Sequence, residues 1–164
     1  MNQGSGELSH VGPDNQPGMV DVGEKKVTLR EATARSVVVL PDAVLELLEN
    51  DEIQSKKGPV FQTAIVAGTA AVKQTSTLIP FCHPLPIEGC DITIRVNDAR
   101  DVEIDCSVRV HARTGVEMEA LVGATTAALT VYDMCKAVSH DIRIRETGLL
   151  RKTGGKRDVD LPSL

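Results

Sequence analysis

The chain has 164 residues, of which 41% are hydrophobic and 25% charged, a composition typical of one globular domain with an apolar core. Aromatic residues make up only 2% and the net charge is -5, which argues against base-stacking platforms and against a general attraction to nucleic acid. No apolar run approaches the roughly 20 residues of a membrane span, and the polar first 17 residues lack the pattern of a signal peptide.

The chain divides into a leader, one domain and a short tail. Residues 1–18 are polar and Gly-rich and predict a disordered leader. The domain is expected at 19–157, without an internal repeat or a linker, and residues 158–164 are expected to be a tail.

The first half of the domain predicts one strand and two helices. Residues 28–40 are rich in Thr and Val and end in a Val-Val-Val-Leu run typical of a strand. A Pro-Asp pair then opens a short helix expected at 43–49, because Pro is favoured in the first turn. Residues 55–59 read as a basic loop, and apolar residues near helical spacing predict a second helix at 60–74.

A proline-rich loop and a hairpin follow. Residues 75–88 contain three prolines, so this segment cannot be one continuous helix or strand over its whole length. Residues 91–96 and 102–110 both alternate apolar and polar side chains. The turn-forming cluster between them, at 97–101, predicts an antiparallel pair.

The last part of the domain predicts a long helix at 116–138, rich in small residues, and a strand at 141–150. A Gly-rich basic loop is expected at 152–156. When the two early helices count as one layer, the element order is β-α-β-β-α-β. The sequence therefore predicts an α+β, ferredoxin-like sandwich, with an antiparallel sheet and helices packed on one face.

The long helix carries ionisable groups at both ends and no charge between residues 121 and 130. Glu117 and Glu119 lie in its first turn, where the helix dipole favours carboxylates, so a purely structural role explains them equally well. Asp133 and Lys136 are i, i+3 neighbours near its end, and the ordinary alternative is a solvated ion pair.

The helix is too long for one small ligand to reach both ends. Glu119 and Asp133 are roughly 21 Å apart at 1.5 Å per residue. Two copies of the helix packed antiparallel across a twofold axis would bring opposite ends together, and small residues such as Gly123 and Ala127 would permit a close approach. We therefore hypothesise a site shared between subunits.

Other ionisable residues stand in loops. His83 beside Cys82 indicates a substrate contact or a proton donor, although a structural loop histidine is as good an explanation. Together with Cys90 they match no zinc-ligand spacing, so no metal site is expected. The four cysteines form no CxxC pair and no export signal is present, which favours reduced thiols and a cytoplasmic location.

Lysines supply further candidates. Lys57 precedes a predicted helix start and suits a general acid or base, whereas a loop lysine is usually just solvated. Lys73 is either a partner of a helix dipole or a phosphate contact. Lys152 and Lys156 flank a flexible Gly-Gly pair that could wrap a phosphate; the spacing is not that of a Walker A motif, and a basic tail is the alternative.

Four longer motifs stand out: KGPVF at 57–61, LIPFCHPL at 78–85, TGVEMEA at 114–120 and YDMCKAV at 132–138. Together they resemble one family, the MoaC proteins, which are cyclic pyranopterin monophosphate synthases of molybdenum cofactor biosynthesis. The resemblance extends from about residue 19 to residue 156. Several long motifs in a coherent order are far more specific than any short pattern.

The resemblance implies a reaction and a set of residues. The family converts 3′,8-cyclo-7,8-dihydro-GTP to cyclic pyranopterin monophosphate and releases pyrophosphate. By resemblance, Asp133, Lys136 and Lys57 are catalytic, and the fold is ferredoxin-like in a hexamer, a trimer of dimers with sites at dimer interfaces. Residues expected to line or adjoin the substrate pocket are Phe81, Cys82, His83, Glu117, Met118 and Glu119.

The triphosphate of such a substrate needs cations, for which Lys73, Lys152 and Lys156 are available. Gln74 departs from the basic residue expected in some family members, which puts a phosphate role at that position in doubt. No cofactor is expected, and a Mg²⁺ ion accompanying the triphosphate is left open. A non-catalytic nucleotide-binding regulatory module and a metal hydrolase using Cys82 and His83 are the competing interpretations.

Overall fold

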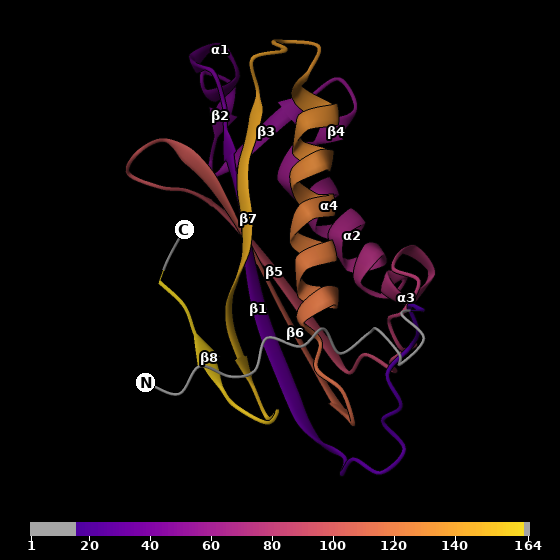
Figure 1. Ribbon diagram of the computed structural model, residues 1–164. Coiled ribbons are helices and arrows are strands. Elements are labelled where there is room, and N and C mark those ends of the chain that lie inside the picture. The colour runs from indigo at the N-terminus through magenta and orange to yellow at the C-terminus, as the bar shows by residue number, and fades with distance from the viewer. Residues whose placement is uncertain (1–15, 163–164) are drawn as a thin grey trace.

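The computed structural model describes residues 16–162, so most of the predicted leader lies outside the described residues. Its main feature is a sheet of strand order β5-β6-β1-β7-β8 in which every neighbouring pair is antiparallel (Figure 1). The strands are β1 (Thr28–Val39), β5 (Gly89–Val96), β6 (Asp101–Ala112), β7 (Arg143–Thr153) and β8 (Val159–Asp160). With β1 between β6 and β7, this order confirms the predicted ferredoxin-like arrangement.

Two helices cover one face of this sheet, α2 (Val60–Val72) and α4 (Glu117–Cys135) (Figure 1). Helix α4 packs on β1, β6 and β7, whereas α2 packs on β5 and against α4. The α+β sandwich expected from the sequence is therefore confirmed.

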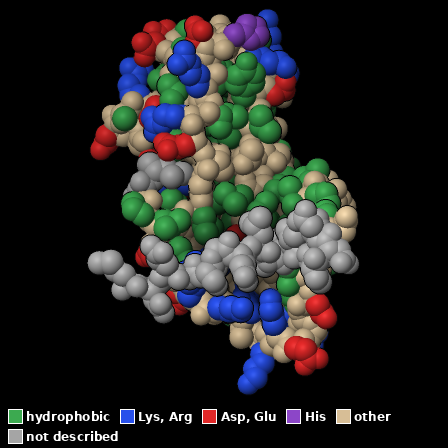
Figure 2. Space-filling view, in the orientation of Figure 1, with side chains coloured by type: hydrophobic (Ala, Val, Ile, Leu, Met, Phe, Trp, Pro, Cys, Tyr) green, Lys and Arg blue, Asp and Glu red, His purple; other side chains and the backbone are tan. Residues whose placement is uncertain are grey.

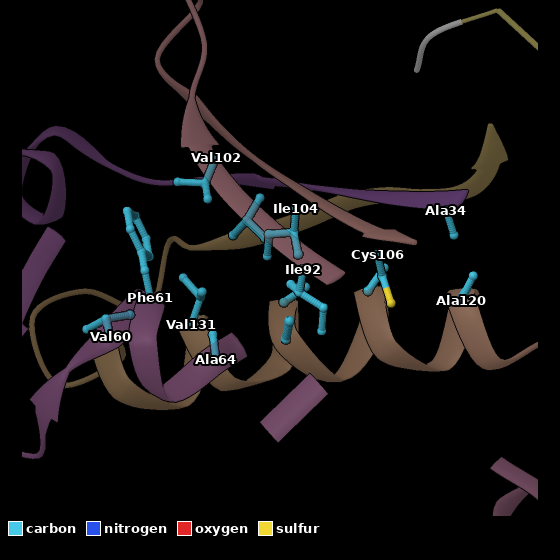
Figure 3. Close-up of a cluster of buried hydrophobic side chains, with 14 of the residues drawn as sticks. Ala34, Val60, Phe61, Ala64, Ile92, Val102, Ile104, Cys106, Ala120 and Val131 are labelled. Carbon is cyan, nitrogen blue, oxygen red and sulfur yellow. The ribbon is translucent and has the colours of Figure 1, made fainter. Parts of the chain in front are cut away.

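The core lies between the helices and alternate residues of the strands. Val102, Ile104 and Cys106 of β6 are fully buried and point towards the helices, where they meet Ala120 and Val131 of α4 (Figure 3). These side chains are aliphatic or small, as a chain with 2% aromatic residues requires. The period of two in β6 decides which side chains enter the core.

The odd-numbered residues of β6 lie on the other face of the sheet and, except for Ser107, are ionisable. The Arg35 guanidinium pairs with Asp105 at 2.6 Å and with Glu103 at 3.3 Å. Arg95 contacts the same two carboxylates. Because each charge has an opposite partner, this polar face needs no apolar cover.

The two helices approach closely at glycines. A Cβ atom on Gly68 of α2 would stand 2.8 Å from the backbone oxygen of Gly123 in α4 and 2.6 Å from Ile92. A side chain there would push α2 away from α4 and from the sheet.

We therefore expect Gly68→Ala to lower the free energy of unfolding by about 1–3 kcal/mol, as overpacking of a core does. This would occur although alanine is the better helix former by about 1 kcal/mol. Urea denaturation measures the change, and Gln62→Ala, on the exposed side of α2, serves as the control. An unchanged or higher stability for Gly68→Ala would contradict the close approach.

The predicted helix at 43–49 is wrong in its second half. Helix α1 covers only Asp42–Leu45, and Leu48–Glu49 forms strand β2, which pairs with β3 (Glu52–Ser55). Asn50 and Asp51 between them have φ of 50° and 61°, the conformation of a tight two-residue hairpin turn. An Asn-Asp pair was therefore the local signal for a hairpin.

Other helix and strand boundaries also differ from those predicted from the sequence. The loop predicted at 55–59 contains strand β4 (Gly58–Pro59), which pairs with β3 and completes a small sheet of order β2-β3-β4. Residues 75–88, which were not expected to be regular throughout, begin with the short helix α3 (Thr75–Leu78). Strand β7 continues to Thr153, past the predicted end at residue 150, and β8 pairs with it inside the segment expected to be a tail.

Candidate active site

The last turn of α4 and the β3–β4 turn bring two lysines onto one carboxylate. Lys57 Nζ donates to Asp133 Oδ2 at 2.6 Å and to the Asp133 backbone oxygen at 3.3 Å. Lys136 Nζ lies 2.7 Å from the other oxygen, Oδ1. The structure thus joins the three residues expected to be catalytic, although Lys57 and Asp133 are 76 positions apart.

The β3–β4 turn presents Lys57 through specific backbone contacts. The Lys57 backbone N–H donates to Ser55 Oγ at 3.1 Å, and this hydroxyl donates to the Gly58 backbone oxygen at 3.0 Å. Gly58 has φ of +114°, a conformation that side-chain-bearing residues rarely adopt. The KGP sequence therefore forms a tight turn with the lysine at its tip.

The two ammonium groups change the titration of the carboxyl. Hydrogen bonds from Lys136 and then Lys57 lower the pKa of Asp133 to about 2. The same contact with Asp133 raises the pKa of Lys136 above its usual value. At neutral pH the cluster therefore holds an ionised Asp133 and a protonated Lys136.

Asp133 is expected to titrate near pH 2, which a ¹³C NMR titration of its carboxyl carbon measures. A carboxyl whose pKa is lower in the folded chain stabilises the fold above its unfolded pKa, and this contribution is lost as the pH falls from about 4 towards 2. Replacing Lys136 by Met should raise the midpoint more than replacing Lys57, because Lys136 is the larger cause. If Asp133 of the wild-type chain titrated at the usual 3.8, the two lysines would not hold its carboxylate as the structure shows.

The opposite end of α4 borders a cationic cleft of about 660 Å³. Glu117 Oε1 lies 2.6 Å from Lys152 Nζ, which ties the first turn of α4 to β7. Gly154, with φ of +79°, packs against the backbone oxygen of Leu29, which leaves no room for a Cβ atom. Seven basic residues line the cleft: Lys25, Lys26, Arg30, Arg113, Lys152, Lys156 and Arg157.

Five of these cations were not among the candidates from the sequence. Lys25 and Arg30 stand before and within β1, and Arg113 follows β6, so no short pattern joins them. The available signal was position: Arg113 directly precedes the TGVEMEA motif. Only two acidic residues, Glu31 and Glu117, join the lining, so the cleft favours an anion.

Glu119 and the Phe-Cys-His segment lie together near the same end of α4. Glu119 is only 4% exposed, and burial raises its pKa, with the charge of Glu117 adding to the effect. Burial also raises the pKa of the Cys82 thiol, with a contribution from nearby Glu119. Phe81 and Met118 are partly exposed apolar side chains there. These residues combine polar and apolar side chains near this end of α4.

Six of the expected substrate contacts lie outside the cleft lining: Phe81, Cys82, His83, Met118, Glu119 and Lys73. Lys73 is the C-cap residue of α2 and is exposed. It does not line the cationic cleft, and neither does His83, which is half-buried after Cys82. The structure thus groups Lys152, Lys156 and Glu117, but sets Lys73 apart from them.

The two ends of α4 are separate within one chain, as the sequence predicted. Its 19 residues span about 28 Å. The surface over the middle of α4 and α2 is largely uncharged, with charged side chains gathered beyond it (Figure 2). Both helices also carry exposed apolar side chains: Val66 of α2 is 69% exposed and Leu129 of α4 is 54% exposed. A chain on its own therefore leaves an apolar helix face open between two charged clusters.

Within residues 16–162, no three His, Cys, Asp or Glu side chains gather in a way that could hold a metal ion. The same described part of the chain has no helix long and apolar enough to cross a membrane.

Comparison with known proteins gives a consistent result. The model of the MoaC family matches residues 19–155. A cyclic pyranopterin monophosphate synthase of Xanthomonas campestris is 56% identical over 94% of both chains, and one of Nitratidesulfovibrio vulgaris is 48% identical over 91% of this chain and 92% of its own. The Molybdenum cofactor biosynthesis protein 1 of Dictyostelium discoideum is 52% identical over 92% of this chain, which spans 26% of that protein.

Proposed function

The chain belongs to the MoaC family, and from this premise we propose that it is a cyclic pyranopterin monophosphate synthase of molybdenum cofactor biosynthesis. The substrate is 3′,8-cyclo-7,8-dihydro-GTP, and the reaction, of the lyase class, releases pyrophosphate. The observation that carries the proposal is the cluster of Lys57, Asp133 and Lys136, in which the β3–β4 turn presents Lys57 to the pair at the end of α4.

This cluster suits a reaction with repeated proton transfers. Opening a purine ring and closing a pterin ring requires protons to be donated and removed at several atoms. Lys136 is protonated at neutral pH, as lysines ordinarily are, and Asp133 raises its pKa further, so it can present a charged N–H donor to the substrate. Lys57, on the other carboxylate oxygen, is placed for a second transfer. Asp133 orients both ammonium groups and stays ionised.

The cationic cleft suits the triphosphate. Lys152 and Lys156 border it together with Lys25, Arg30 and Arg113. Guanidinium and ammonium groups bind phosphate oxygens through charge-assisted hydrogen bonds. No resident cofactor is proposed, and a Mg²⁺ ion could enter with the phosphates that hold it.

The residues around Glu119 suit the ring system. Burial raises the pKa of both Glu119 and Cys82, and their side chains offer polar groups for hydrogen bonds to the ring. Phe81 and Met118 supply apolar contact, and His83 is a candidate base for the sugar hydroxyl that closes the cyclic phosphate.

A complete site requires two chains. The catalytic cluster and the cationic cleft lie at opposite ends of α4, and the face between them is open and uncharged. Two copies packed antiparallel along α4 would place one chain's lysine cluster beside the other's cleft. We propose such a dimer as the unit of a homohexamer, a trimer of dimers, working in the cytoplasm.

The proposal is tested by supplying the purified protein with the cyclised GTP derivative. Cyclic pyranopterin monophosphate and one pyrophosphate per turnover are expected. Binding without any pyrophosphate release would instead indicate the non-catalytic regulatory module, and activity lost on chelation but restored by zinc would indicate a metal hydrolase.

A further inference from the structure

Glu52, the first residue of β3, caps a helix to which it does not belong. Its Oε1 accepts the backbone N–H of Phe61 at 2.8 Å, and Oε2 accepts that of Gln62 at 3.1 Å. The first N–H groups of a helix have no acceptor within the helix. The N-cap residue of α2, Pro59, makes no side-chain cap, and its first turn has no acidic residue. The Glu52 carboxylate fills both roles.

The charge of the same carboxylate is felt at the end of α4. The pKa of Cys135 is raised to about 11 by burial and, secondarily, by the negative charge of Glu52. Cys135 is buried in the turn that carries Asp133 and Lys136. Glu52 therefore stands at the junction between the start of α2 and the last turn of α4.

Lys57 lies on the segment that Glu52 closes. Between Glu52 and Phe61 the chain makes β3, a turn and β4, and the Ser55 hydroxyl holds the tip of this hairpin. The Glu52 contacts hold its base by tying β3 to the helix that follows β4. These contacts fix the backbone position of Lys57, whereas the side chains of Lys57 and Asp133 are both about half-exposed.

We propose that Glu52 is a positioning residue for the Lys57–Asp133 pair, acting through its hydrogen bonds to the first turn of α2. The charge of Glu52 matters as well as its shape. Its two oxygens accept three backbone N–H groups, including that of Ile53 at 2.8 Å. A glutamine has one acceptor oxygen and would turn an NH₂ group towards a donor. The catalytic meaning of this role rests on the proposed function.

The test compares Glu52→Gln with Glu49→Gln. Glu49 is the exposed cross-strand neighbour of Glu52, so the control removes the same charge from the same hairpin. For Glu52→Gln, the NMR midpoint of Asp133 is expected to rise from about 2 by about 1 pH unit, as one of its two cations is loosened. We expect kcat to fall about 10- to 100-fold with KM within about twofold, as for a misplaced catalytic group. Glu49→Gln should leave both at wild-type values.

The outcomes separate three cases. The proposal would be overturned if Glu52→Gln showed the same Asp133 midpoint and the same kcat as the wild type. It would also be overturned if the variant lost thermal stability while its Asp133 midpoint stayed unchanged. A raised midpoint in a protein whose wild type shows no turnover would keep the positioning role and reject the proposed function. If Glu52→Gln does not fold, Glu52→Asp is the second variant, because it keeps the charge and shortens the side chain by one methylene. The titration midpoint of Asp133 should rise in this variant too. An unchanged Asp133 midpoint would also overturn the proposal.

Discussion

Lys136→Ala and Lys57→Ala are each expected to lower kcat by about 10²- to 10⁴-fold, the usual contribution of a positioned acid or base. Each removes one of the two ammonium groups on Asp133, at 2.7 and 2.6 Å, and so one proton donor of the cluster. KM should change much less, because the cationic cleft that suits the triphosphate lies at the other end of α4. Pyrophosphate release at saturating substrate measures the loss.

Lys56→Ala is the matched control for these variants. Lys56 precedes Lys57 in the same turn and is exposed, and removing it changes the net charge equally. It should retain wild-type kcat. Near-normal turnover in both Lys57→Ala and Lys136→Ala, with substrate bound, would show that the cluster is not the catalytic centre.

Mixing two inactive variants, one from each end of α4, is expected to restore activity. In a dimer of Lys57→Ala and Lys152→Ala chains, one shared site carries both lesions and the other carries neither. Random mixing of equal amounts should then recover about a quarter of wild-type kcat, because about half of the dimers are mixed and each has one intact site. Mixing by joint refolding or co-expression, followed by the turnover assay, measures the recovery.

The control for complementation joins two lesions at the same end. Lys57→Ala mixed with Lys136→Ala should stay inactive, because every shared site then lacks one lysine of the cluster. If the first mixture also stayed inactive while mixed dimers were demonstrated by mass spectrometry, each site would belong to a single chain and the proposed antiparallel dimer would be wrong.

The fold was predictable where a local period is strong. Alternation along β5 and β6, with a turn cluster between them, predicted their antiparallel pairing, and the small-residue run predicted α4 to within three residues at its end. The β2–β3 hairpin was missed because strands of two and four residues are too short to show a period, and only the Asn50-Asp51 turn identifies them. The shortened α1 follows from the same turn.

The candidate site was predictable in its local part. Asp133 and Lys136 are helix neighbours, so their pairing follows from spacing alone. Spacing could not indicate that Lys57 reaches the same carboxylate, because the two residues are 76 positions apart. The family resemblance implied that Lys57 is catalytic but named no partner for it. The additional cations of the cleft, such as Arg30 and Arg113, come from separate strand ends and gather only when β1, β6 and β7 pair.

By itself, the sequence determined the sandwich, the family to which the chain is related and the separation of charge between the ends of α4, because each depends on local periods or on continuous motifs. The tertiary structure alone decided which distant groups meet. The two lysines on Asp133, the seven-cation cleft and the cap that Glu52 places on α2 all join residues from different elements. Their distances depend on how strands pair and helices pack, and no spacing along one element encodes them.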